Sequence, residues 1–100
     1  MAFEQDWSHP ASSDLRRIIE DHDARDPDWT DAIVAAIMEK LDSLSVNPYL
    51  SSIYKQTPWG NVRDALVGSY RLFFRIKEAD QILRLERIQH VRQQDPDFPE

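Results

Sequence analysis

The chain contains no cysteine among its 100 residues. A protein without thiols has no disulfide framework, thiolate metal site or cysteine nucleophile, which excludes the zinc-ribbon and thiol-enzyme classes. The absence also favours a reducing compartment. No apolar run approaches the roughly 18 residues that span a membrane, and residues 1–6 do not form the basic start of a signal peptide. We therefore expect a soluble, cytoplasmic protein with no membrane partner.

Internal repeats and low-complexity segments are also absent. One hundred residues, 41% of them hydrophobic, are enough for one compact core and too few for two. The segment 93–100 carries two prolines and three acids, a composition typical of irregular structure at a chain end. The sequence therefore predicts a single domain over residues 1–92, followed by an irregular tail over residues 93–100.

The two signs of charge are unevenly distributed along a chain whose formal net charge is −6. Acids dominate the first half, at Asp14, Glu20, Asp21, Asp23, Asp26, Asp28, Asp31, Glu39 and Asp42. Cations outnumber acids in the segment 55–92, at Lys55, Arg63, Arg71, Arg75, Lys77, Arg84, Arg87 and Arg92. Such asymmetry can leave a basic patch on an acidic protein. The alternative is that the two halves pair with each other.

The first half of the chain predicts a short strand and two helices. Apolar and polar residues alternate over residues 3–7, which predicts a strand that ends before Pro10. Ser12 or Ser13 is expected to cap a first helix. Its buried stripe comprises Leu15, Ile18, Ile19 and His22. Asp26 and Pro27 then predict the start of a second helix, which ends at Asn47-Pro48. The apolar face of that helix comprises Trp29, Ile33, Ile37, Leu41 and Leu44.

The second half predicts strands. The segment 49–60 has no clear period and is predicted to be a loop. Strands are expected over residues 62–67, 70–77 and 81–89, with Gly68-Ser69 and residues 78–80 as tight connections. An antiparallel meander needs cover on one face, and two amphipathic helices supply it. The predicted fold is therefore a two-layer α+β domain in the order β-α-α-β-β-β, with the N-terminal strand and the helical hairpin packed on an antiparallel sheet.

Strict alternation in residues 70–77 separates an apolar face from a basic one. Tyr70, Leu72, Phe74 and Ile76 share one face of the predicted strand, and Arg71, Phe73, Arg75 and Lys77 share the other. The first set is expected to build the core. The second set is expected to form a basic surface with an aromatic ring embedded in it.

No metal site is predicted. His22 lies near Asp21, Asp23, Asp26 and Asp28, but these residues match no calcium-loop spacing and provide a single imidazole. A solvated helix end followed by a helix cap explains the same residues. We expect no metal and no other cofactor.

Several segments, taken in order, resemble the RelE/ParE superfamily of type II toxins. They are residues 11–15, 44–50, 62–66, 68–76 and 88–92, and they include a Tyr70-Arg71 strand followed by a strand that ends in His90-Val91-Arg92. The resemblance implies a RelE/ParE-like fold and a bacterial toxin that a cognate antitoxin wraps and holds inactive as a hetero-oligomer. In this superfamily the RelE-like branch cleaves messenger RNA on the ribosome without a metal, and the ParE-like branch poisons DNA gyrase.

The RelE-like activity would assign catalytic roles to three residues. Cleavage needs a base, an acid and cations that stabilise charge on the phosphate. The resemblance places Arg71 at the phosphate, His90 as acid or base, and Arg92 at the transition state. The alternatives are that Arg71 pairs with an acid such as Glu86 across the sheet and that His90 is an ordinary polar residue.

The remaining candidate residues would bind nucleic acid or a protein partner. Phe73 would stack on a base. Arg63, Arg75 and Lys77 would supply charge, Arg75 and Lys77 either as a solvated face or as an antitoxin docking surface. Trp59 is expected to pack in a core or to meet a partner as an exposed indole.

Three departures separate this chain from RelE-like nucleases. Extra lysines are missing before the Tyr-Arg strand, where Arg63 and Asp64 stand, and the C-terminal tyrosine is replaced by Phe98. Residues 90–99 resemble the ending of ParE-like chains. The acidic pI of about 4.9 is unusual for a protein that enters the ribosome. These features favour the ParE-like branch, and a non-catalytic protein-binding domain on the same fold is the alternative.

Overall fold

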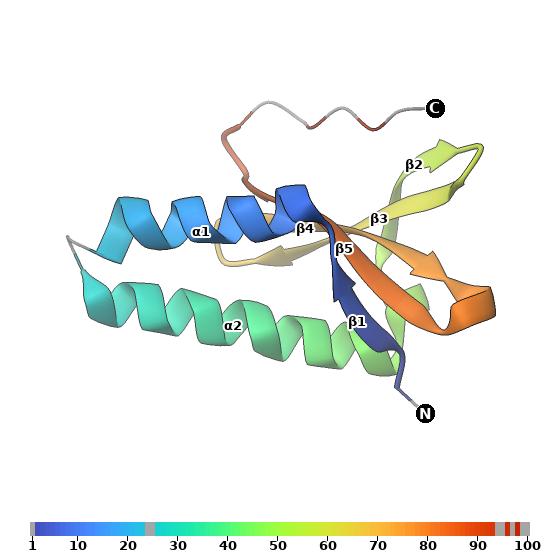
Figure 1. The fold of residues 1–100 in the computed structure, drawn as a ribbon, viewed down its shortest axis with the longest axis horizontal. Helices are drawn as coiled ribbons and strands as arrows, with labels where there is room; N and C mark the ends of the chain where they lie inside the picture. Colours follow the sequence, from blue (N-terminus) through green and yellow to red (C-terminus); the bar gives the residue numbers. More distant parts are fainter. Residues whose placement is uncertain (1, 24–25, 94–95, 97, 99–100) are drawn as a thin grey trace.

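The computed structural model describes residues 2–23, 26–93, 96 and 98. Its elements, in chain order, are β1 (Glu4–Trp7), α1 (His9–Asp23), α2 (Pro27–Val46), the 3₁₀ helix η1 (Pro48–Leu50), β2 (Ser52–Thr57), β3 (Gly60–Val67), β4 (Tyr70–Lys77), the 3₁₀ helix η2 (Glu78–Asp80) and β5 (Ile82–His90). In Figure 1, α1 and α2 form a helical hairpin beside the sheet. The predicted α+β fold with a strand, two helices and a meander is confirmed.

The sheet has five strands in the order β1-β5-β4-β3-β2. Strands β2 to β5 form an antiparallel meander, and β1 joins β5 in parallel, with Glu4 opposite Ile82 and Trp7 opposite Leu85. The N-terminal strand is therefore an edge strand of the sheet, which makes the sheet mixed. The predicted turn at Gly68-Ser69 is confirmed, and Gly68 adopts the left-handed φ of 56° that tight hairpins need.

The predicted loop over residues 49–60 is wrong, because this segment contains η1 and the strand β2. The meander consequently has four strands instead of three. Strand β2 lies at the edge of the sheet, and its register against β3 shifts between Ile53 and Lys55. A bulge of this kind breaks the two-residue period, so the segment shows no strand pattern in the sequence.

The predicted start of the first helix is also wrong. Helix α1 begins at His9, before Ser12 and Ser13, and its first turn contains Pro10. The Oγ of Ser8 accepts a hydrogen bond from the Ala11 backbone N–H at 3.1 Å. Pro10 lies in the first helical turn, where a proline is tolerated. His22, predicted on the buried stripe, has a side chain outside the described part of the molecule.

The second helix agrees with its prediction. Asp26 caps it through Oδ1, which accepts the Trp29 N–H at 3.1 Å, and Pro27 is its first residue. Of its predicted face, Ile37, Leu41 and Leu44 are buried against the sheet and Ile33 packs against the same core, whereas Trp29 is exposed. Of the predicted tail, the structure describes Gln93, Pro96 and Phe98.

The main core lies between the helices and one face of the sheet. Its fully buried side chains include Ile37, Leu41, Leu72, Phe74, Leu83 and Leu85. A smaller cluster lies on the opposite face and contains Val62, Phe73 and Phe98, with Tyr54 packed against them. We call this opposite face the outer face. Within the described residues, no helix has the length and apolarity that a membrane span requires.

Candidate functional site

Strand β4 separates core residues from charged residues as its alternation predicts. Tyr70, Leu72 and Phe74 belong to the main core, whereas Phe73 belongs to the cluster on the outer face. Arg71 shares that outer face, since its guanidinium lies 4.9 Å from the Phe73 ring centre and 5.3 Å from that of Tyr54. The sequence therefore predicted correctly which side chains of β4 face the helices.

Arg71 forms an ion pair on the outer face. Its Nη2 donates to Oδ2 of Asp64 at 2.8 Å, from β4 to the neighbouring strand β3. The expectation of a cross-strand acid is thus met by Asp64, and Glu86 pairs elsewhere. A guanidinium held between a carboxylate and two aromatic rings is fixed in position.

Two other cations of the outer face, Arg75 and Arg84, also have acidic neighbours. Arg75 and Arg84 approach Glu86 Oε1 at 3.9 and 3.2 Å, and Arg84 also pairs with Asp6 of β1. Arg75 donates a further hydrogen bond to Thr57 Oγ1 at 2.9 Å. The predicted basic surface is therefore interleaved with carboxylates, which reduces the positive potential that it presents to an anion.

The two halves of the chain pair in part, as the alternative reading of the charge distribution proposed. Asp14 of α1 is buried and accepts from Arg87 Nε at 2.7 Å, Arg87 Nη2 at 3.0 Å and the Ile88 N–H at 3.0 Å. The hydrogen bond to Asp14 raises the pKa of Arg87 above its ordinary value. This ion pair fixes α1 to β5.

Arg63 lies apart from Arg71. Its Nη1 donates to the backbone carbonyl of Ser51 at 2.7 Å and to that of Tyr49 at 3.4 Å, and its guanidinium lies 5.4 Å from the Tyr49 ring centre. Arg63 is opposite Phe74 in the sheet, which places it on the helix-facing side. These contacts anchor η1 and the start of β2 to β3.

His90 lies on the helix-facing side of the sheet. It is opposite Tyr70, and the two rings pack edge to face with centres 5.4 Å apart. It lines a small cavity of about 190 Å³ with Asp14, Arg17 and Asp21. Burial, and then the charge of Asp21, raises the pKa of Tyr70 in this cavity. Arg71 and His90 therefore lie on opposite faces of one sheet.

Arg92 lies beside His90 in the turn after β5. It is exposed, and its backbone N–H donates to His90 Nδ1 at 3.1 Å. The fold brings His90 and Arg92 together but leaves Arg71 on the far side of the sheet.

The remaining predicted binding residues are scattered. Phe73 is fully buried, and its ring packs against those of Tyr54 and Phe98, so neither face is open to a nucleobase in this arrangement. Lys77 is exposed at the end of β4, and Trp59 is 78% exposed at the tip of the β2–β3 hairpin. Within the described residues, no three His, Cys, Asp or Glu side chains lie close enough to hold a metal ion.

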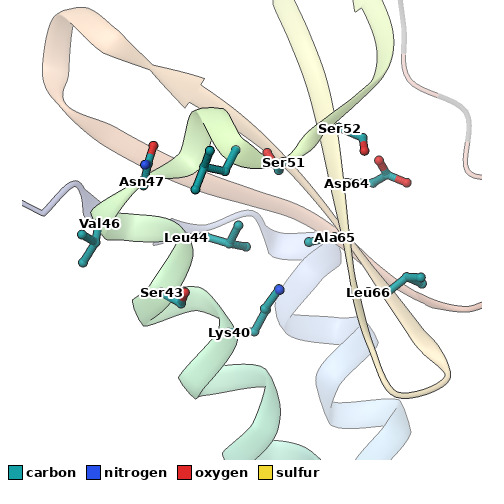
Figure 2. A pocket seen from close by; sticks show the side chains of 11 residues that line it. Lys40, Ser43, Leu44, Val46, Asn47, Ser51, Ser52, Asp64, Ala65 and Leu66 are labelled. Carbon is teal, nitrogen blue, oxygen red and sulfur yellow. The ribbon is translucent and has the colours of Figure 1, made fainter.

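A groove that the sequence did not reveal runs between the end of α2, η1 and β3 (Figure 2). Its volume is about 750 Å³, and three exposed apolar side chains line it: Val46, Leu50 and Leu66 are 71%, 82% and 61% exposed. In Figure 2, Lys40 and Leu44 of α2 lie across the groove from Ala65 of β3, whereas the Leu66 side chain points away from α2. We call this the α2–β3 groove. Leu50, an apolar residue within the segment predicted as a loop, was the available signal.

An open strand edge lies along the same groove. Strand β2 pairs with β3 only from Gly60 to Asp64, while β4 pairs with β3 as far as Val67. Among the described strands, none flanks residues 65–67 of β3 on the groove side. An edge of this kind offers backbone donors and acceptors to an added strand.

Comparison with known proteins gives a consistent family. Residues 6–95 match the family described as the ParE toxin of the type II toxin-antitoxin system parDE. A search of curated protein sequences gives no significant match.

Three solved structures share the fold. A chain of the toxin-antitoxin complex RelBE2 from Mycobacterium tuberculosis is 22% identical, with a TM-score of 0.67 over 90% of this chain and 92% of that one. A chain of the chromosomal ParDE system from P. aeruginosa is 19% identical, with a TM-score of 0.71 over 89% and 96%. A mutant of E. coli toxin RelE in the free state is 14% identical, with a TM-score of 0.67 over 92% and 86%. Because the family match covers nearly the whole sequence, the chain belongs to the ParE toxin family and is the toxin component of a type II toxin-antitoxin system.

Proposed function

We propose that this toxin inhibits growth through protein contacts with DNA gyrase and is not an RNA nuclease. The observation that carries the proposal is the position of Arg71 and His90 on opposite faces of the sheet. An RNA-cleaving site needs its acid, base and cations around one phosphate. A gyrase target also requires a cytoplasmic location.

The balance of charge on the outer face supports the same proposal. Asp64 pairs with Arg71, and Glu86 lies beside both Arg75 and Arg84. These carboxylates would repel the phosphates of a message placed on this face. A protein surface has no such requirement for excess positive charge.

The test is induced expression in a bacterial host, with pulse labelling of DNA and protein synthesis. We expect DNA synthesis to fall first, the DNA-damage response to rise, and purified toxin to inhibit supercoiling by gyrase. His90→Ala is the matched variant, because it removes the one candidate general acid or base and is expected to retain inhibition within about twofold. A prior fall in protein synthesis that His90→Ala abolishes would establish the nuclease. Unaffected growth would favour the non-catalytic binding domain.

The proposed function includes neutralisation by an antitoxin that docks on the α2–β3 groove. Val46, Leu50 and Leu66 expose apolar surface there beside the open edge of β3. Clustered apolar side chains next to an unpaired strand edge suit a segment that combines an apolar face with an extended strand. The proposal therefore includes a hetero-oligomer of toxin and antitoxin.

Charge placed in the groove should separate neutralisation from toxicity. We expect Leu50→Asp and Leu66→Asp to inhibit growth even when a cognate antitoxin is co-expressed, because a carboxylate in an apolar interface is costly to desolvate. Val91→Asp is the control, since Val91 is also exposed (47%) but lies outside the groove lining. Normal rescue of both groove variants by the antitoxin would exclude the groove as its docking site.

A further inference from the structure

The outer face of the sheet contains an aromatic socket that the chain fills with its own C-terminal segment. The socket comprises Tyr54, Val62 and Phe73, of which Val62 and Phe73 are fully buried. The side chain that covers them is Phe98, which is 5% exposed. The Phe98 ring centre lies 5.6 Å from that of Phe73 and 6.2 Å from that of Tyr54, and those two rings lie 4.9 Å apart. Phe98 is thus held by two tilted or edge-on aromatic contacts.

Cationic groups border the socket. Lys55 Nζ donates to the backbone carbonyl of Phe98 at 3.3 Å. The Arg71 guanidinium lies over the Tyr54 and Phe73 rings, at 5.3 and 4.9 Å. The site therefore combines an apolar floor, a donor for a peptide carbonyl and two cationic side chains at its rim, of which Arg71 also pairs with Asp64.

The sequence around Phe98 is complementary to that rim. Residues 93–100 contain three acids, at Asp95, Asp97 and Glu100, and two prolines on either side of the phenylalanine. Proline favours extended backbone and removes N–H groups that would otherwise need partners. The occupant of the socket is therefore one aromatic ring carried by an acidic segment of extended preference.

The buried ring of Phe98 contributes to holding this occupant in the socket. Burial of that ring and its aromatic contacts oppose the loss of conformational freedom in a chain end. When the ring leaves, Val62 and Phe73 lose the side chain that covers them on this face. An aromatic side chain from another acidic segment would be favoured in its place.

We propose that the aromatic socket, with Lys55 and Arg71, is a binding site for an acidic segment of a partner protein that carries an aromatic residue, and that Phe98 occupies this site in the free chain. Partner and tail then compete for one site. The tail has the advantage of a high effective concentration, which a partner must overcome by affinity or by a second contact. The inference stands on the socket alone and is independent of the cellular target.

The probe for this site is a fluorescein-labelled peptide with the sequence of residues 93–100. Fluorescence anisotropy would measure its binding to the full-length wild type and to full-length Phe98→Ala, after circular dichroism has shown that the variant is folded. We expect binding to Phe98→Ala to be about tenfold tighter or more, because the variant lacks the competing ring. Affinity should fall as salt is raised, since the peptide is acidic and the socket carries Lys55 and Arg71 at its rim.

Two matched controls define the contribution of each part of the ligand. A peptide with alanine in place of its phenylalanine should not bind Phe98→Ala, and a peptide with its acids replaced by amides should bind it more weakly. Tyr54→Ala combined with Phe98→Ala should lose binding of the original peptide. Equal binding to wild type and Phe98→Ala, or no binding to Phe98→Ala at millimolar protein, would overturn the proposal.

A second measurement keeps the test decisive if Phe98→Ala does not fold. Wild type with 4-fluorophenylalanine at position 98 gives a ¹⁹F signal that nearby aromatic rings shift from its free value. We expect that shifted signal to move towards the free value when the unlabelled peptide is added in excess. A signal at the free value from the start, or one that excess peptide leaves unchanged, would refute competition for the socket.

Discussion

At the scale of single residues, Asp14 shows how a polar group is accommodated inside this small domain. Its carboxylate is 6% exposed and accepts three hydrogen bonds, two from Arg87 and one from the Ile88 backbone. Burial of a charge without partners is costly, whereas a carboxylate with a guanidinium fork and a backbone donor is satisfied. Asp14 therefore has a structural role, and its ion pair with Arg87 fixes one wall of the cavity that His90 also lines.

Removal of the Asp14 carboxylate should destabilise the fold. We expect Asp14→Ala to lower the free energy of unfolding by about 2–4 kcal/mol, because it leaves Arg87 and the Ile88 N–H without their acceptor. Asp6→Ala serves as the control, since Asp6 pairs with Arg84 at a more exposed position and should cost less than about 1 kcal/mol. Urea unfolding monitored by circular dichroism gives both values. Equal losses in the two variants would contradict the assigned role.

Tyr70 predicts a pH dependence. Burial and the charge of Asp21 raise its pKa in the folded chain above the ordinary value of 10.0. The stabilisation from the neutral phenol is therefore complete below about pH 10 and is lost as pH rises through the raised folded pKa. We expect unfolding free energies to fall more steeply above pH 10 in wild type than in Tyr70→Phe, and the two curves to run parallel below it. Parallel curves at every pH would show that Tyr70 does not contribute.

The sequence predicted the faces of β4 but not the position of His90. Alternation fixes which residues of a regular strand share a face, and β4 is regular. Strand β5 has a bulge: Phe74 is opposite Leu85 and Phe73 is opposite Arg87, so Glu86 is an extra residue. The bulge moves His90 to the helix-facing side, and only the uneven spacing of Leu83, Leu85 and Ile88 signals it. The partner of Arg71 was likewise unpredictable, because it depends on register.

At the scale of elements, Ser8 determines where α1 begins. Its Oγ accepts from the Ala11 N–H and donates to the Glu86 carbonyl at 2.7 Å, and its side chain is buried. One hydroxyl thus caps the helix and joins it to β5. The sequence has serines at positions 8, 12 and 13 near the helix start, and cap preference pointed to Ser12 or Ser13. The contacts of Ser8 with β5, which the sequence does not show, favour Ser8 as the cap.

Loss of this hydroxyl should cost more than loss of a predicted cap. We expect Ser8→Ala to lower the unfolding free energy by about 1–2 kcal/mol, since it removes both a cap and the hydrogen bond to the Glu86 carbonyl of β5. Ser12→Ala, on the exposed surface of α1, should change it by less than about 0.5 kcal/mol. Thermal and urea unfolding of the two variants measure the difference. A larger effect at Ser12 would restore the cap that the sequence suggested.

Helix α2 and strand β2 show what makes an element readable. Helix α2 carries its cap, its proline and its apolar stripe in the sequence itself, so its bounds were predicted well. Strand β2 is an edge strand with a bulge, and it is recognised as a strand only through its pairing with β3. The α2–β3 groove lies between a well-predicted element and that misassigned segment, which explains why the sequence did not reveal it.

At the scale of the whole molecule, the arginines clustered on the outer face lie next to carboxylates that balance their charge. The chain carries −6 overall, and three carboxylates, those of Asp6, Asp64 and Glu86, lie among the cations of the outer face. A nucleic-acid ligand gains most of its affinity when cations replace its counterions. Balanced charge does not weaken the binding of a protein partner, whose affinity comes from shape and apolar contact.

Nucleic-acid affinity should therefore be weak and should increase when these acids are neutralised. We expect a 20-nucleotide single-stranded RNA to bind wild type more weakly than about 100 µM at 0.15 M salt. Asp64→Asn combined with Glu86→Gln keeps size and polarity but removes two negative charges beside Arg71, Arg75 and Arg84, so it should tighten binding several-fold and steepen the salt dependence. Fluorescence anisotropy across a salt series measures both. Micromolar binding by wild type, with a steep salt slope that the double variant does not change, would mean that the outer face already presents its cations to phosphate, and the nuclease would then regain the stronger claim.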